Sequence, residues 1–160
     1  MRELIKKIQP LSALKNYGGI LCHGCFDILH VGHVRHLKYA RALSPTLPLI
    51  VTITGDTHIR KGPGRPVFDE WLRAEVLAAM EMVDVVSVVD EPTGLTAITT
   101  IRPQYYVKGK EYAEPIGING MEQRAVQERG GCIIFTDRWA SSTEIVERLL
   151  NVSLQRDRAT

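Results

Sequence analysis

The chain has 160 residues, of which 44% are hydrophobic and 24% charged, the proportions of a soluble globular protein rather than of a fibre or a disordered chain. Its 20 basic and 18 acidic residues nearly balance, which argues against a large nucleic-acid footprint. The three cysteines suit no disulfide framework, no apolar run approaches the roughly 20 residues that span a bilayer, and the start lacks a signal-peptide core, so we expect a cytoplasmic protein.

The expected elements alternate between strands and helices along the chain. Residues 1–18 carry Leu4, Ile8 and Leu11 at helical spacing, which predicts a short helical extension packed outside the sheet. The run Leu47–Thr54 is almost continuously apolar or β-branched, which is typical of a central strand covered on both faces. In order, the patterns predict a strand over Ile20–Cys22, a helix over 31–43, a strand over Leu47–Thr54, a loop over 57–66, a helix over Asp69–Met82 with Leu72, Val76 and Met80 on one apolar face, a strand over Val83–Val89, a helix carrying Leu95, Ile98 and Ile101, a strand over Tyr105–Val107, a loop or tether over 109–118, a helix over Asn119–Arg129, a strand over Cys132–Phe135 and a closing helix over Ser142–Asn151.

This alternation predicts the fold class. Strands separated by helices of about ten residues require right-handed crossovers, so we expect an α/β, Rossmann-like, three-layer fold with a five-stranded parallel sheet and helices on both faces. A chain of this length fits one domain. We expect residues 1–160 to form that domain, with the extension at 1–18, a catalytic core at 19–150 and a tail at 151–160.

Two histidines open the first long helix. His30 and His33 are three residues apart and share one helix face, beside amides that no earlier carbonyl can satisfy. Gly32 between them has no Cβ, so a phosphate can approach the main chain while the imidazoles bond its oxygens. Gly24 permits the sharp turn between strand and helix. The pattern therefore indicates an anion site.

Two other interpretations of these residues stay open. The histidines can be incidental to a strand-to-helix turn. Alternatively, His33 and His36 with Cys22 and Cys25 offer zinc-ligand spacings, although no second cluster follows at finger spacing.

A basic loop follows the second strand. Residues 57–66 are rich in Gly and Pro, and Lys61 and Arg65 supply cations that can neutralise a polyphosphate. The loop lies after the carboxyl end of a strand, where open α/β sheets place ligands. A merely solvated basic loop is the alternative.

The stretch from His23 to His33, HGCFDILHVGH, resembles the signature of the cytidylyltransferase-like nucleotidyltransferases. Within that family, KGPGRPV at 61–67, Arg73, VKGKEY at 107–112 and ASSTEI at 140–145 look like the adenylyltransferases that act on heptose 1-phosphate, often fused to a sugar kinase. The resemblance covers about residues 19–150. Three positions depart from the usual pattern: His23 stands where Asn or Gly is common, and Lys110 and Glu111 stand where Gly and Asp are.

The resemblance implies a reaction and a set of site residues. It implies transfer of a nucleoside monophosphate, with adenylyl favoured over cytidylyl, from a nucleoside triphosphate to a sugar 1-phosphate such as heptose 1-phosphate, with release of pyrophosphate. The alternatives are a cytidylyltransferase for a polyol or other sugar phosphate, and a non-catalytic nucleotide-binding module. The implied residues are His30, His33 and Lys61 as catalytic groups; Gly24, Cys25, Phe26, Gly32, Arg138, Ser141, Ser142 and Thr143 as nucleotide contacts; and Asp27, Asp56, Arg73, Lys108 and Tyr112 as acceptor contacts.

The resemblance also implies ligands and partners. Mg²⁺ is expected with the nucleoside triphosphate, bound mostly by its phosphates, and we expect no protein metal site. A homodimer is expected, with neither nucleic acid nor membrane as a partner. Ser141 and Glu144 also fit a capping box, which would explain both residues without any ligand.

Overall fold

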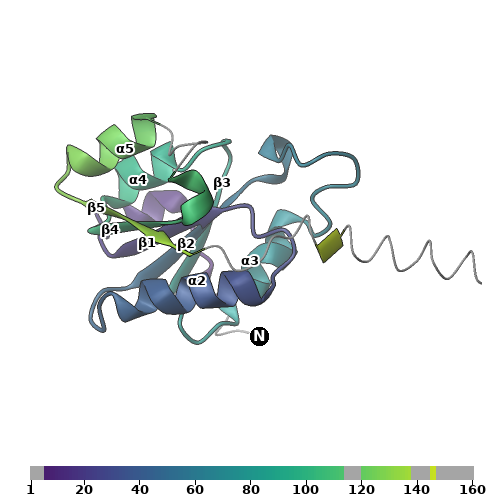
Figure 1. Cartoon of the computed structure of the whole chain (residues 1–160), viewed down its shortest axis with the longest axis horizontal. Coiled ribbons are helices and arrows are strands. Elements are labelled where there is room, and N and C mark those ends of the chain that lie inside the picture. The colour runs from purple at the N-terminus through teal and green to yellow at the C-terminus, as the bar shows by residue number, and fades with distance from the viewer. Residues whose placement is uncertain (1–5, 114–119, 138–144, 147–160) are drawn as a thin grey trace, which may run out of the picture.

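The computed structural model describes residues 6–113, 120–137 and 145–146. Five strands form one parallel sheet in the order β3-β2-β1-β4-β5 (Figure 1), which confirms the predicted Rossmann-like α/β fold. The strands are β1 (Ile20–Gly24), β2 (Leu49–Thr54), β3 (Val85–Val89), β4 (Tyr105–Gly109) and β5 (Cys132–Thr136); the α-helices are α2 (Val31–Ala42), α3 (Glu70–Ala78), α4 (Leu95–Ile101) and α5 (Gly120–Gln127); and the 3-10 helices are η1 (Leu11–Leu14), η2 (Asp56–His58) and η3 (Lys110–Tyr112).

The sheet separates two layers of apolar side chains. On one face, α2 and α3 pack Leu37, Ala74 and Leu77 against the strands. On the other face, α4 and α5 contribute Ile98 and Val126. Figure 1 shows the two helix pairs on opposite sides of the sheet. The predicted arrangement of helices on both faces is therefore correct.

The strand order reverses at β1. This strand pairs in parallel with β2 on one side and with β4 on the other. The helices that follow β1 and β4 go to opposite faces of the sheet, because α2 belongs to one apolar layer and α5 to the other. Doubly wound sheets bind their ligands at the carboxyl ends of the strands where the order reverses, and we refer to this edge, at the ends of β1 and β4, as the crevice.

Helix α3 turns a different face to the sheet from the one that its apolar spacing suggests. Leu72 and Val76 are 47% and 50% exposed, whereas Leu77 is completely buried. Arg73 is turned inward to reach main-chain carbonyls, and this rotation carries its neighbour Leu72 outward. The small side chain of Ala74 allows the buried face to lie close to the strands. The helix also ends at Ala78, short of the predicted end.

The sequence predicts a short helix, interrupted by Pro10, that packs outside the sheet. The described part of this N-terminal segment joins the core instead. Ile8 forms a parallel bridge with Val86 of β3, and Leu14 of η1 is completely buried. Pro10 lies between these two contacts. A proline in a helix interior removes a hydrogen bond and clashes with the preceding turn, so one helix does not run through both contacts.

The predicted closing helix and tail lie outside the described residues, except that Ile145 and Val146 are helical. No helix in the described ranges has the length and apolar character needed to cross a bilayer.

Candidate active site

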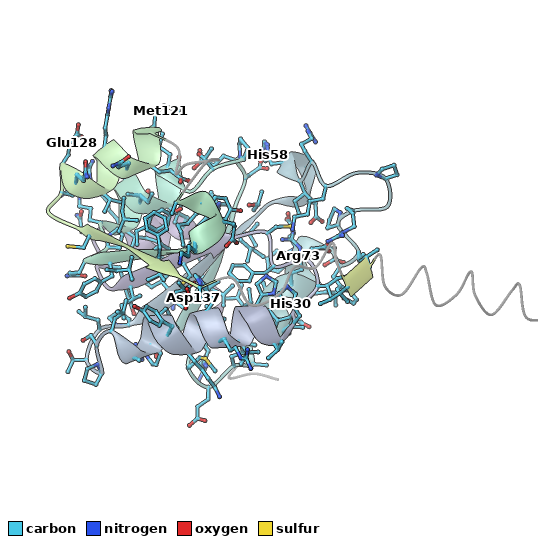
Figure 2. All side chains as sticks on the ribbon, viewed as in Figure 1. His30, His58, Arg73, Met121, Glu128 and Asp137 are labelled. Carbon is cyan, nitrogen blue, oxygen red and sulfur yellow. The ribbon has the colours of Figure 1, made fainter. Side chains whose placement is uncertain are left out.

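The turn between β1 and α2 places an imidazole at the helix start (Figure 2). His30 is the N-cap of α2, and its Nδ1 accepts a 3.1 Å hydrogen bond from the amide of Gly32. An accepting Nδ1 carries no proton, so this ring is neutral and its Nε2 is the nitrogen that can donate. The Gly32 amide, predicted to face a phosphate, is thus occupied by His30 in this structure.

Phe26 and His33 complete the turn. The ring of Phe26, at a positive φ of 49°, covers Gly24 so closely that a Cβ there would lie 3.2 Å from it. The ring of His33 lies against that of His30, with centroids 3.9 Å apart and planes tilted by 33°, and it also contacts the ring of Phe26, whose centroid is 5.0 Å away. Burial lowers the pKa of His33 to about 3, helped by repulsion from His30 and His36 when these rings are protonated and by the charge of Lys61. At neutral pH this ring is a neutral hydrogen-bonding group.

The basic loop is fastened to the same turn by a buried carboxylate. Asp27 is 1% exposed, and its oxygens accept hydrogen bonds from Nε of Arg65 and from the amides of Val67, at 2.6 Å, and Phe68, at 3.2 Å. Lys61 lies exposed on this loop, yet it acts electrostatically on His33, as described above. The loop therefore brings the predicted catalytic lysine into the electrostatic reach of the predicted catalytic histidine.

Arg73 joins three segments around this turn. Its guanidinium has no exposed surface and donates to the carbonyls of Cys25, at 2.5 Å, and Thr54, at 2.9 Å, and to Oδ1 of Asp56, at 2.5 Å. Asp56 and Glu70 also exchange amide-to-carboxylate hydrogen bonds of 3.0 and 3.2 Å. These partners engage the hydrogen-bonding groups of Arg73 and Asp56, and the basic loop engages those of Asp27. The side chains of Arg73, Asp56 and Asp27 therefore hold the loops around the crevice in place.

A second cation lies at the carboxyl end of β4. Lys108 is 6% exposed; its Nζ is 4.3 Å from the ring centroid of Tyr112 and 3.5 Å from the carbonyl oxygen of His23. Burial lowers the pKa of this amine. The β1–β4 pairing therefore brings Lys108 and Tyr112, two of the predicted acceptor contacts, to the crevice.

His36 also belongs to this site, although its sequence pattern suggested only a possible zinc ligand. Its Nδ1 lies 2.7 Å from Oγ1 of Thr136, the last residue of β5. Burial, and then the charge of Lys108, lower the pKa of His36 to about 4. The three-residue spacing that joins His30 to His33 continues to His36, and this repeat was the available signal.

The donor set does not form a protein metal centre. No group of three or more His, Cys, Asp or Glu within the described ranges could hold a metal ion. Cys22 is completely buried, and burial raises its pKa to about 12, which keeps it a thiol rather than the thiolate that zinc binds. The carboxylates of Asp27 and Asp56 are held by arginines, so the described residues offer no cage for Mg²⁺ either.

The remaining predicted nucleotide contacts lie outside the described residues. These are Arg138, Ser141, Ser142 and Thr143. The described chain reaches Asp137, directly after β5, at the same carboxyl edge of the sheet as Lys108.

Comparison with known proteins gives a consistent match. Residues 21–148 match the cytidylyltransferase-like family. The bifunctional protein HldE of Syntrophotalea carbinolica is 37% identical over 155 residues, covering 94% of this chain and 31% of that protein. HldE of Rhodopseudomonas palustris is 44% identical over 133 residues, covering 81% of this chain and 26% of that protein. The chain thus spans less than a third of the length of these relatives.

Two solved structures share the fold. The lipopolysaccharide core biosynthesis protein of Thermoplasma volcanium superposes with a TM-score of 0.58 at 22% identity, covering 77% of this chain and 97% of that one. The pantoate-beta-alanine ligase of Francisella tularensis gives a TM-score of 0.57 at 14% identity, covering 84% and 68%. At these identities the likeness concerns the fold alone.

Proposed function

Because this chain belongs to the cytidylyltransferase-like family, we propose that it is a nucleotidyltransferase that acts on a sugar 1-phosphate. It moves a nucleoside monophosphate, adenylyl in preference, from a nucleoside triphosphate to an acceptor such as heptose 1-phosphate, and releases pyrophosphate. The observation that carries this proposal is the contact between the rings of His30 and His33 at the start of α2, where the charge of Lys61 acts on His33. The sequence motif at 61–67 supports a sugar phosphate as the acceptor.

The chemistry needs alignment and charge stabilisation rather than a strong base. The acceptor phosphate is already anionic near neutral pH, so one of its oxygens attacks the α-phosphorus directly. A new oxygen–phosphorus bond forms as the bond to the bridging oxygen breaks, and pyrophosphate leaves with that electron pair. His30 and His33 donate hydrogen bonds to the reacting phosphate, and Lys61 offsets its negative charge.

The start of α2 has to rearrange when a phosphate binds there. The Gly32 amide has one hydrogen, which now goes to Nδ1 of His30. A phosphate oxygen at the helix start competes for that hydrogen, and the imidazole that it displaces can turn toward the ligand.

Asp27, Asp56 and Arg73 act on this reaction through the loops. Asp27 holds the segment that carries Lys61, and Arg73 holds the carbonyl of Cys25 beside the helix start. Gly24, Cys25 and Phe26 form the backbone turn that the triphosphate approaches. Ser141, Ser142, Thr143 and Arg138 are proposed to bind the leaving pyrophosphate, as the family resemblance implies.

Mg²⁺ is proposed to accompany the nucleotide. The nucleotide phosphates hold it, since the carboxylates of Asp27 and Asp56 are engaged by arginines. When bound, it neutralises phosphate charge. The homodimer and the cytoplasmic location also stay predictions, and light scattering on the purified protein tests the first.

A pyrophosphate-release panel tests the function. It crosses ATP, CTP, GTP and UTP with heptose 1-phosphate, other sugar 1-phosphates and a polyol phosphate. We expect release with ATP and a sugar 1-phosphate. Release with CTP and a polyol phosphate favours the cytidylyltransferase alternative, and nucleotide binding without release from any pair favours a non-catalytic module.

A further inference from the structure

Helix α2 carries His30 at its N-cap and His33 in its first turn, so its position on the sheet decides where both rings lie. Leu37 and Ala40 bury one face of this helix in the core. Apolar contacts are not directional, so on their own they let a helix shift or turn on the sheet. A hydrogen bond fixes both the distance and the direction between its partners. The hydrogen bonds between α2 and the strands therefore determine the register of this helix.

One such hydrogen bond joins the middle of α2 to the edge strand β5. Nδ1 of His36 lies 2.7 Å from Oγ1 of Thr136, the last residue of β5, although the two residues are 100 positions apart. Thr136 is 2% exposed. Figure 2 shows the end of β5, which Asp137 marks, beside the middle of α2. The bond is therefore largely removed from water.

Thr136 links this attachment to the neighbouring strand. Its Oγ1 also lies 3.5 Å from the carbonyl oxygen of Lys108, and the strand register places Thr136 opposite Gly109. The amine of Lys108 lies at the crevice, as described above. His36 is therefore connected, through Thr136, to the end of β4 that carries Lys108.

The spacing of the histidines connects this attachment to the site. His33 and His36 are separated by about 4.5 Å along the helix axis, since three residues rise 1.5 Å each. A movement of α2 that breaks the bond to Thr136 therefore also moves His33. The other end of α2 is held less firmly, because Arg41 pairs with Asp84 at 3.1 Å where both side chains are partly exposed.

We infer that His36 is a positioning residue: its hydrogen bond with Thr136 fixes the register of α2 against the ends of β4 and β5, and thereby sets the distance between His33 and Lys108. The inference rests on the proposed function, because it takes His33 to act on the nucleotide and Lys108 on the acceptor. The two phosphates must meet in line for the transfer, so a change in this distance lowers the rate more than the affinity. His36 itself touches no reacting atom.

A double-mutant cycle tests this link. Thr136→Val keeps the shape of threonine without the hydroxyl, and His36→Leu removes the ring nitrogens. Each single variant should lower kcat for pyrophosphate release about tenfold, with the KM values for ATP and the sugar 1-phosphate within about twofold of wild type. Because both changes remove the same bond, the double variant should lose no more than the larger single loss.

Conservative variants are the matched controls. Thr136→Ser keeps the hydroxyl, and His36→Asn keeps a hydrogen-bonding atom on Cγ, where Nδ1 is attached. Both should retain most of the wild-type kcat. Thr46→Val, which removes an exposed hydroxyl in the loop after α2, should leave kcat unchanged. Wild-type kcat in Thr136→Val, fully additive losses in the double variant, or an equal loss in Thr136→Ser overturns the inference.

NMR on the protein without substrates tests the same link through structure. In the wild type we expect a nuclear Overhauser contact between the His36 ring and the methyl group of Thr136. In Thr136→Val the amide resonances of Gly32 and His33 should shift, and in Thr136→Ser they should not. Absence of the contact overturns the inference even where the variants do not fold, and so do unchanged Gly32 and His33 resonances in Thr136→Val.

The two tests separate this inference from the proposed function. If no nucleotide and sugar phosphate pair releases pyrophosphate in the wild-type protein, the proposed function fails. The NMR resonances still decide whether the bond between His36 and Thr136 sets the register of α2.

Discussion

The carboxylate of Asp27 and the guanidinium of Arg65 form an ion pair that joins the turn before α2 to the basic loop. The side chains are 0% and 7% exposed, so the pair is nearly removed from water. Two amides of the same loop also donate to Asp27. The histidine turn and the loop that carries Lys61 are therefore held as one unit.

Asp27→Asn should loosen this unit. The amide keeps the size of the carboxylate but loses its charge, so the buried ion pair between Asp27 and Arg65 is lost. We expect a loss of about 1–3 kcal/mol in the free energy of unfolding, by urea denaturation, and a larger loss in kcat than in nucleotide affinity. Asp69→Asn is the control, because Asn caps a helix as well as Asp does. Unchanged turnover in Asp27→Asn would show that the loop needs no such anchor.

His33→Ala should lower turnover by on the order of a hundredfold or more, with little loss of stability, because it removes a donor to the developing charge. His58→Ala is the control, since His58 pairs with Asp90 on the surface. Steady-state rates of pyrophosphate release measure this effect. Near-normal turnover in His33→Ala means that the catalytic role given to His33 is wrong.

The buried histidines should make the fold sensitive to acid. The pKa is lowered to about 3 for His23 and His33 and to about 4 for His36, first by burial, whereas each returns to about 6.5 on unfolding. Between these pKa values the unfolded chain binds more protons than the folded one. The contribution of these histidines to the free energy of unfolding is therefore fully present above pH 6.5 and is lost as the pH drops toward 4. Urea midpoints measured from pH 8 to pH 4 test this.

A matched variant checks which groups cause that acid sensitivity. His36→Gln removes one titrating ring and should flatten the decline, while His58→Ala, which removes a ring paired with Asp90 outside the buried cluster, serves as the control and should not. An identical slope in wild type and His36→Gln would exclude His36 as a contributor.

The two leucines of α3 should respond differently to truncation. Leu77 is completely buried and Leu72 is 47% exposed. Leu77→Ala should therefore cost about 2–5 kcal/mol of unfolding free energy, while Leu72→Ala should cost less than about 1 kcal/mol. Thermal and urea unfolding compare the two. A larger loss for Leu72→Ala would mean that the helix turns its other face inward.

The order of strands and helices, the parallel sheet and the family were predictable from the sequence. Each strand is short, apolar and separated from the next by a helix, and this pattern admits few topologies. The contact between His30 and His33 was predicted from their three-residue spacing, and it forms although His30 is the N-cap of α2 rather than a residue of the helix. The family resemblance was also visible without coordinates, and the match over residues 21–148 confirms the family.

The tertiary structure alone decided which charged groups meet and which helix face is buried. Asp27 and Arg65 are 38 residues apart, and Gly94 and Glu122 are 28 apart, so no local period relates them. Their contacts follow from the strand order, which brings distant loops to one edge of the sheet. The same holds for α3, where two apolar stripes compete. Arg73, held by carbonyls of distant loops, determines which stripe faces inward.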